Sequence, residues 1–316
     1  MSGEIATLPG RSTETDMADG ETLTRTPTYQ SLADFLGPGR VHLEAGPAAL
    51  ILAEDEVEVA STLRHHRDAG FRTLVLVASA ELDLPSELGP RTVRVVYDMR
   101  GEGALEEVVN GAIGVARDGI WLYYCYNAEY LFYPFSEHRS VGEMLAFHTE
   151  ERREAMLTFV VDLYAGDLDA HPTAVSLEDA HLDKSGYYAL ARPDPDNHNH
   201  PKERRPDSFG GLRSRFEEHV PAPRRRIDRV GLFRARKELD FLPDHTFAQQ
   251  ELNTYSCPWH NNLTAAICSF RTAKALKRNP GSAFDIRSFR WHNSARFDWH
   301  SRQLLDLGLI EPGQWF

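Results

Sequence analysis

Short apolar runs alternate along the chain with segments whose apolar residues recur at helical spacing. The runs suited to buried strands are residues 49–53, 71–79, 91–98, 120–126, 156–166 and 227–235. Helical spacing predicts helices over residues 54–70, 103–119, 263–278 and about 301–307. Short strands separated by helices are typical of an α/β domain. The pattern therefore predicts a mostly parallel central sheet that is flanked by helices.

The same pattern divides the chain into segments. Residues 1–30 are polar and have no apolar period, so we expect a disordered tail. Residues 31–260 carry the alternation and should form the main domain. Within them, residues 167–226 include a stretch dense in Pro, Asp, Asn and Arg, which predicts a long loop. Residues 261–316 are rich in aromatic side chains and should form a helical extension packed on the main domain.

Composition narrows the class of protein. The 316-residue chain is 41% hydrophobic and contains no apolar run of 18 residues, so no membrane span is expected. No signal-peptide pattern is visible at the N-terminus. Three cysteines are too few for a disulfide scaffold, which favours a reducing cytoplasm.

Charge is distributed unevenly along the chain. The formal net charge of −12 argues against general nucleic-acid binding. Residues 202–237, however, hold 12 Lys and Arg against 5 Asp and Glu. This basic segment is either a site for a phosphate or acidic ligand, or a solvated surface.

Polar side chains follow several of the predicted strands at the points where they end. Glu54, Asp55 and Glu56 follow the first strand, Asp98 closes the third, and the run Trp121–Pro134 is interrupted by Asn127 and Glu129. In open α/β sheets, ligands bind at the carboxyl ends of the parallel strands, so these groups suit a nucleotide or a metal. The three acids after the first strand could instead be the favourable first-turn acids of a helix.

The order of these segments resembles a known family. The stretches RTLVLVAS, WLYYCYNAEYLFYP and MLTFVVDLYAGD, followed by FGGLRSRF and RVGLFRARKELDFLPDH, are similar to bacterial family 2 glycosyltransferases of the GT-A fold. The resemblance covers about residues 45–260. It implies a GT-A-like α/β domain, a nucleotide-sugar donor, and a saccharide or cell-envelope acceptor.

The metal motif of that family is altered here. Aligned without gaps, the family's metal-binding Asp-Ala-Asp-Glu falls on Tyr126, Asn127, Ala128 and Glu129. The family's Asn-Glu pair falls on Asp55 and Glu56. The resemblance implies Mg²⁺ or Mn²⁺, but Glu129 alone remains as a metal ligand of this motif, and hard cations need several oxygen ligands.

The resemblance also implies roles for particular residues. Together with the strand ends and the arginines of the basic segment, it gives the donor-binding residues Asp55, Glu56, Asp98, Asn127, Glu129, Arg213 and Arg234. Asp244 and His245 match the late segment of the family that carries a histidine, so either could take the acceptor proton or assist the leaving group. His245 could also be a structural histidine. Arginines of the basic segment could hold the diphosphate without metal.

Other functions remain open at this point. The altered metal motif favours a second hypothesis, a non-catalytic relative that binds a sugar, a nucleotide or a partner protein. A hydrolase or phosphatase would need a nucleophile elbow or a phosphate loop, and neither is visible. Cys257 and His260 have metal-ligand spacing, with His292 and His300 downstream, but a structural zinc site lacks its second pair. His198 and His200 lie in the Pro-rich segment and are expected to be solvated.

Overall fold

A computed structural model describes residues 26–253 and 262–315, without the side chains of residues 203–205. The strands are β1 (Thr28–Tyr29), β2 (Ala48–Ala53), β3 (Thr73–Ala78), β4 (Thr92–Val96), β5 (Trp121–Tyr126), β6 (Glu129–Phe132), β7 (Ala155–Ala165), β8 (Ala180–Asp183), β9 (Tyr188–Asp194), β10 (His200–Phe209), β11 (Asp228–Arg234), β12 (Ala265–Ser269) and β13 (Ser294–Arg296). The α-helices are α1 (Leu32–Leu36), α2 (Val59–Asp68), α3 (Ala104–Val115), α4 (Val141–Glu150), α5 (Gly211–Arg215), α6 (Arg271–Arg278), α7 (Pro280–Asp285) and α8 (Ser301–Asp306). Short 3₁₀ turns add η1 (Pro38–Leu43), η2 (Pro195–Asn197), η3 (Ala222–Arg224) and η4 (Gln250–Asn253).

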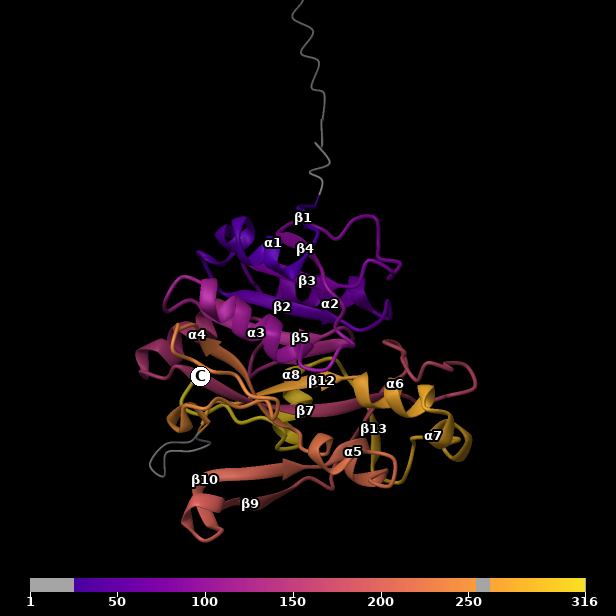
Figure 1. The fold of residues 1–316 in the computed structure, drawn as a ribbon. Coiled ribbons are helices and arrows are strands. Elements are labelled where there is room, and N and C mark those ends of the chain that lie inside the picture. The colour runs from indigo at the N-terminus through magenta and orange to yellow at the C-terminus, as the bar shows by residue number, and fades with distance from the viewer. Residues whose placement is uncertain (1–25, 254–261, 316) are drawn as a thin grey trace, which may run out of the picture.

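A central mixed sheet runs through the molecule (Figure 1). Its strand order is β1-β4-β3-β2-β5-β11-β7-β12-β6, and β8 and β13 extend it from β7. The first five strands of this order are parallel, and β7 pairs parallel with β12. Strand β11 lies antiparallel between β5 and β7. The prediction of an α/β fold with a mostly parallel central sheet is confirmed at this level.

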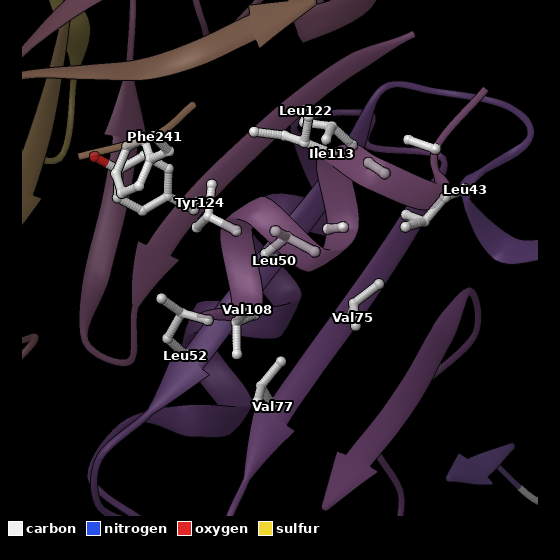
Figure 2. Packing of buried hydrophobic residues seen from close by; sticks show 14 of the residues in the cluster. Leu43, Leu50, Leu52, Val75, Val77, Val108, Ile113, Leu122, Tyr124 and Phe241 are labelled. Carbon is white, nitrogen blue, oxygen red and sulfur yellow. The ribbon is translucent and has the colours of Figure 1, made fainter. Parts of the chain in front are cut away.

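Alternation along the strands explains why helices cover both faces of the sheet. On β2, Leu50 and Leu52 face a core that includes α1 and α3, whereas Ala49 and Ile51 face a core that includes α2 and α4. Figure 2 shows the first of these cores, where Val108 and Ile113 of α3 pack over β2, β3 and β5. Strands that are covered on both faces need apolar side chains on both, so they appear in the sequence as uninterrupted apolar runs.

Two predicted helices differ from the structure. The helix expected over residues 54–70 begins only at Val59, because residues 54–58 form the turn that carries the acids after β2. The helix expected over residues 263–278 is wrong in its first half, where β12 runs between β7 and β6 before α6 begins. The Ala-rich run is buried on both sides in the sheet, and this tertiary burial overrides its helical propensity.

The segment predicted as a long loop, residues 167–226, is also corrected. It contains β8, the hairpin of β9 and β10, and α5. The hairpin escaped prediction because its β9 residues are largely exposed, so they show no alternation of apolar and polar positions. The C-terminal segment likewise adds two strands, β12 and β13, to its helices.

The aromatic residues of the C-terminal segment pack as expected where the structure describes them. Phe270, Phe289 and Phe297 are buried, and the Trp299 ring lies edge-on to Tyr130 with centroids 4.9 Å apart. Trp259 lies outside the described residues. Within the described ranges, no helix is both long and apolar enough to cross a membrane.

Candidate functional site

The carboxyl ends of β2 and β5 are joined by Asn127. These strands are parallel neighbours, with Leu52 opposite Tyr126, so the residues that follow them emerge at the same edge. The Asn127 Nδ2 donates to Asp55 Oδ1 at 2.6 Å, and its Oδ1 accepts from the Glu54 backbone N–H at 3.1 Å. The next residue, Ala128, adopts a φ of 60° in the tight turn to β6. Asn127 is therefore a buried tie between two strand ends.

Helix α6 supplies cations to these acids. Arg271 donates two hydrogen bonds to the Glu54 carboxylate, of 2.7 and 2.6 Å. The Lys274 ammonium lies 3.0 Å from Asp55 Oδ2, and Arg278 donates to the same oxygen at 2.6 Å. The three cations are spaced i, i+3 and i+7, which places them on one face of the helix.

Charge pairing changes the acidity of these groups. Burial raises the pKa of Asp55, but the charge of Lys274 and the hydrogen bonds from Lys274 and Asn127 outweigh it, so the pKa lies below its usual value. Burial lowers the pKa of Lys274, and Asp55 opposes that shift only in part. Asp55 is therefore ionised at neutral pH, and its charge stabilises the ammonium form of Lys274.

Glu129 forms a second, fully buried ion pair at the start of β6. Its two oxygens accept hydrogen bonds from the Arg229 guanidinium, each 3.0 Å long. Ser269 Oγ donates to one oxygen at 2.9 Å, and the Tyr126 backbone N–H donates to the other at 2.8 Å. Burial raises the pKa of Glu129, but Arg229 and these donors lower it to about 2.

This arrangement does not fit a divalent cation held by Glu129. Each Glu129 oxygen already accepts two hydrogen bonds, and the nearest charge is the guanidinium of Arg229. The Asn127 oxygen is used by Glu54. Over the part of the chain that the structure describes, no group of three or more His, Cys, Asp or Glu side chains could hold a metal ion. Glu129 is therefore bound by groups of the chain and is not arranged as a metal ligand.

A third group of charges, Asp162 and Arg213, lies next to Glu129. Asp162 of β7 is directly opposite Ser269 of β12, and Ser269 bonds Glu129. The Asp162 carboxylate accepts from the Arg213 backbone N–H at 3.3 Å and from Arg213 Nε at 3.4 Å. Burial raises the pKa of Asp162, and Arg213 opposes the shift only in part.

We call the three groups together the acid–cation cluster. It consists of Glu54, Asp55, Glu129 and Asp162 with Arg213, Arg229, Arg271, Lys274 and Arg278. Its five cations exceed its four carboxylates. The least covered cation is Arg278, whose side chain is 52% exposed. A net positive, partly open cluster at a strand edge suits an anionic ligand.

The predicted catalytic pair lies near this edge. Because β11 is antiparallel to β5, the first residues of β11 lie where β5 ends. Asp244 accepts a hydrogen bond from Arg226, just before β11, at 3.1 Å. His245 Nδ1 is 3.0 Å from the Tyr124 hydroxyl, and its backbone φ is 63°. Burial, together with Arg229, Arg271 and other arginines, holds the pKa of His245 well below its usual value.

Three of the predicted site residues have surroundings apart from the cluster. Asp98 is paired with Arg100 at 2.9 Å on the surface. Arg234 donates to the Gly119 carbonyl and lies opposite Trp121, at the start of β5 and so at the other edge of the sheet. Glu56 is exposed in the turn after β2 and has no hydrogen bond among the described contacts.

Sequence reasoning missed most of the cations. Arg271, Lys274 and Arg278 were assigned only to a helix, although their i, i+3, i+7 spacing was a usable signal. Arg229 lies within the predicted strand 227–235, and nothing in the local pattern marks it as a site residue. Its pairing with Glu129 joins residues 100 positions apart, which no local pattern reveals.

The zinc hypothesis for Cys257, His260, His292 and His300 stays a prediction. Cys257 and His260 lie outside the described residues. His300 is exposed, caps α8, and lies 3.7 Å from Glu137. His198 and His200 are exposed at the turn of the β9–β10 hairpin, as expected.

An open cavity of about 630 Å³ lies elsewhere, beside α8. It is lined by Lys184, Ala295, Asp298, His300, Arg302, Gln303, Asp306 and Leu307. None of these residues belongs to the acid–cation cluster. The cavity is therefore separate from the charged groups at the strand ends.

Comparison with known proteins yields no family. No protein-family model matches the chain, and no curated protein matches it significantly.

Proposed function

We propose that the protein is a glycosyltransferase-like protein that binds a nucleotide-sugar donor at the carboxyl ends of β2 and β5. The observation that carries this proposal is the convergence of Asp55, Asn127 and Glu129 with the cations of α6 and β11 at one edge of the sheet. Ligands of open α/β sheets bind at this edge. The parallel strands followed by the antiparallel β11 are compatible with the GT-A-like fold that the sequence resembles.

The diphosphate of the donor would be held by cations of the chain. Arg278 and Arg271 are the more exposed cations of the cluster and have guanidinium groups, which bind phosphate oxygens through parallel N–H donors. Lys274 and Arg229 are buried and support them through their carboxylate partners. In this proposal, guanidinium groups stabilise the departing diphosphate in place of a divalent metal.

Asp244 is the better candidate for the base that takes the acceptor proton. Its side chain is 45% exposed, and bonds from Thr246 and Arg226 outweigh its burial and keep its pKa below the usual value, so it is ionised. A neutral His245 with so low a pKa is a weak base. In the proposed step, the saccharide hydroxyl attacks the anomeric carbon, its proton passes to Asp244, and the bond to the diphosphate breaks.

A second candidate function is binding without catalysis, in which the protein is a non-catalytic relative that binds a sugar, a nucleotide or a partner protein. It is favoured by the saturation of the cluster, since the oxygens of Asp55 and Glu129 are already bonded to groups of the chain. A relative that binds a nucleotide sugar would do so without releasing the sugar, and one that binds a partner protein would bind neither UDP nor GDP.

The test is the affinity of the Arg278→Gln variant for UDP and GDP, measured by calorimetry. We expect binding of the preferred nucleotide to weaken about tenfold, because a charge-assisted bond to the diphosphate is lost. Arg287→Gln is a matched control, since Arg287 is an exposed arginine just beyond the same helical region. Equal affinity of the two variants would remove α6 from the site. Failure of the unaltered protein to bind either nucleotide would favour the interaction-protein alternative.

A further inference from the structure

The hairpin of β9 and β10 is held to the body mainly by polar contacts. In Figure 1 it projects from the rest of the molecule beneath β7 and α5. None of its described residues belongs to the buried hydrophobic clusters, and Tyr188 and Leu190 are exposed. A segment with few buried apolar contacts opens at lower free energy than the core around it. The hairpin is therefore a separate unit of low local stability.

Glycines with positive φ stand at both ends of the hairpin. Gly186 precedes β9 with a φ of 93°, and Gly211 follows β10 with a φ of 64°. Such residues permit backbone rotation that other residues resist. A Cβ on Gly186 would meet no atom within 4 Å, so packing does not explain the glycine there. Chain ends of this kind are typical of hinges.

Ion pairs fasten the hairpin to β11 and to the turn before His245. Arg192 of β9 lies 2.7 Å from Asp207 of β10, 3.8 Å from Asp228 and 3.6 Å from Asp244. Arg226 of the body contacts the same three aspartates. We call these five residues the latch. If the hairpin swings away, Asp207 leaves Arg226 but keeps Arg192, and Arg226 still neutralises Asp228 and Asp244. Release therefore leaves none of the three aspartates without a cation.

Both ends of the hairpin lie next to neighbours of the acid–cation cluster. Its β10 end bonds Asp228 through the Ser208 N–H at 2.7 Å, and Asp228 is followed by Arg229. At its other end, Gly211 packs so closely on the cluster that a Cβ there would lie 2.9 Å from Asp162 Oδ2. Movement at either point therefore acts directly on residues of the cluster or on their neighbours.

The composition of the hairpin argues against a strand-docking surface. Pro193, Pro201 and Pro206 lie in its two strands, and the register shifts between Pro201 and Pro206. Proline has no N–H to offer a further strand, and bulges and prolines are the usual protection of exposed edges. The exposed ribbon is thus better suited to moving than to adding a partner strand.

We propose that residues 188–209 form a hinged flap beside the acid–cation cluster, and that the latch holds the flap in the position seen here. Opening separates Arg192 from Asp228 and Asp244 and uncovers the edge where β11 begins. Two glycine-flanked ends, polar attachment and a releasable cation together carry this proposal, which goes beyond the proposed function and does not depend on which ligand binds. Two other contacts also have to break on opening: Asp207 with Arg226 of the body at 3.1 Å, and Lys202 with Gln250 at 3.3 Å.

The test is hydrogen exchange, followed by mass spectrometry, on the protein without ligand. Arg192→Gln should raise exchange of the β9 and β10 amides about tenfold while the β2, β3 and β5 amides keep their rates. Arg192→Lys keeps the charge but not the planar guanidinium group. Its hairpin amides should exchange at rates between those of the unaltered protein and those of Arg192→Gln. Arg225→Gln is the control, because Arg225 neighbours the latch but bonds Val220 and Glu217 instead. In the unaltered protein, 1 M salt should act in the same direction as Arg192→Gln.

Two results would overturn the flap. One is that the hairpin amides of Arg192→Gln exchange at the same rate as those of the unaltered protein. The other is faster exchange that spreads equally through β7 and β11, which would make Arg192 a support of the whole fold. The association rate of UDP provides a separate readout that rests on the proposed function. If the hairpin opens in this selective way but no nucleotide binds, the flap stands and the transferase proposal fails.

Discussion

Replacing Arg229 by methionine should lower the free energy of unfolding by about 3–5 kcal/mol. Methionine fills part of the space but leaves the Glu129 carboxylate buried with only the Ser269 hydroxyl and the Tyr126 N–H as donors. An uncompensated buried charge costs far more than the pair itself contributes. Equilibrium denaturation in urea measures the change.

Arg224→Met is the matched control for this prediction. Arg224 is an exposed arginine in the same basic segment, and its replacement should change the unfolding free energy by less than about 0.5 kcal/mol. A loss below about 1 kcal/mol in Arg229→Met would contradict the buried ion pair.

The same pair predicts how stability depends on pH. The folded pKa of Glu129, about 2, lies below the ordinary 4.5. Its stabilising contribution is therefore fully present above pH 4.5 and is lost as the pH falls towards 2. In Arg229→Met this particular loss should disappear, because the depression of the pKa depends on the guanidinium.

Removal of Asp55 should have a similarly large effect. Asp55→Ala leaves the Lys274 ammonium in a buried position without its counter-charge, and Asn127 loses an acceptor. We expect the free energy of unfolding to fall by about 3–5 kcal/mol, measured by urea denaturation. The double variant Asp55→Ala/Lys274→Met should recover part of the loss, since no unpaired ammonium remains.

The neighbouring Glu56 supplies the control for Asp55. Glu56→Ala removes an exposed acid from the same turn and should be nearly neutral. If Asp55→Ala were as stable as Glu56→Ala, the hydrogen bonds and ion pairs that join β2, β5 and α6 would not contribute as described.

How far the sequence predicts the fold depends on burial. Strands β2, β3 and β5 are covered on both faces, so each appears in the sequence as an uninterrupted apolar run. The sequence predicts a helix over β12, where Ala265 and Ala266 favour helices locally. The place of β12 in the sheet is fixed instead by contacts with distant strands.

The site was predictable from the strand ends but not from its charges. Asn127 and Glu129 interrupt an apolar run, and a buried polar group must have a partner. Which partner it has is a matter of the fold: Glu129 finds Arg229 and Asp55 finds Lys274, each far away along the chain. Arg234 is a cation of the kind that binds phosphate, but it lies opposite Trp121 at the other edge of the sheet, which the sequence does not indicate.

Calorimetric titration of UDP and GDP, once in EDTA and once in Mn²⁺, most directly tests whether cations of the chain replace a divalent metal at the strand ends. We predict that one nucleotide binds with dissociation constants that agree within about twofold in the two buffers. Binding that appears only with Mn²⁺, or no binding in either buffer, would contradict the proposed site.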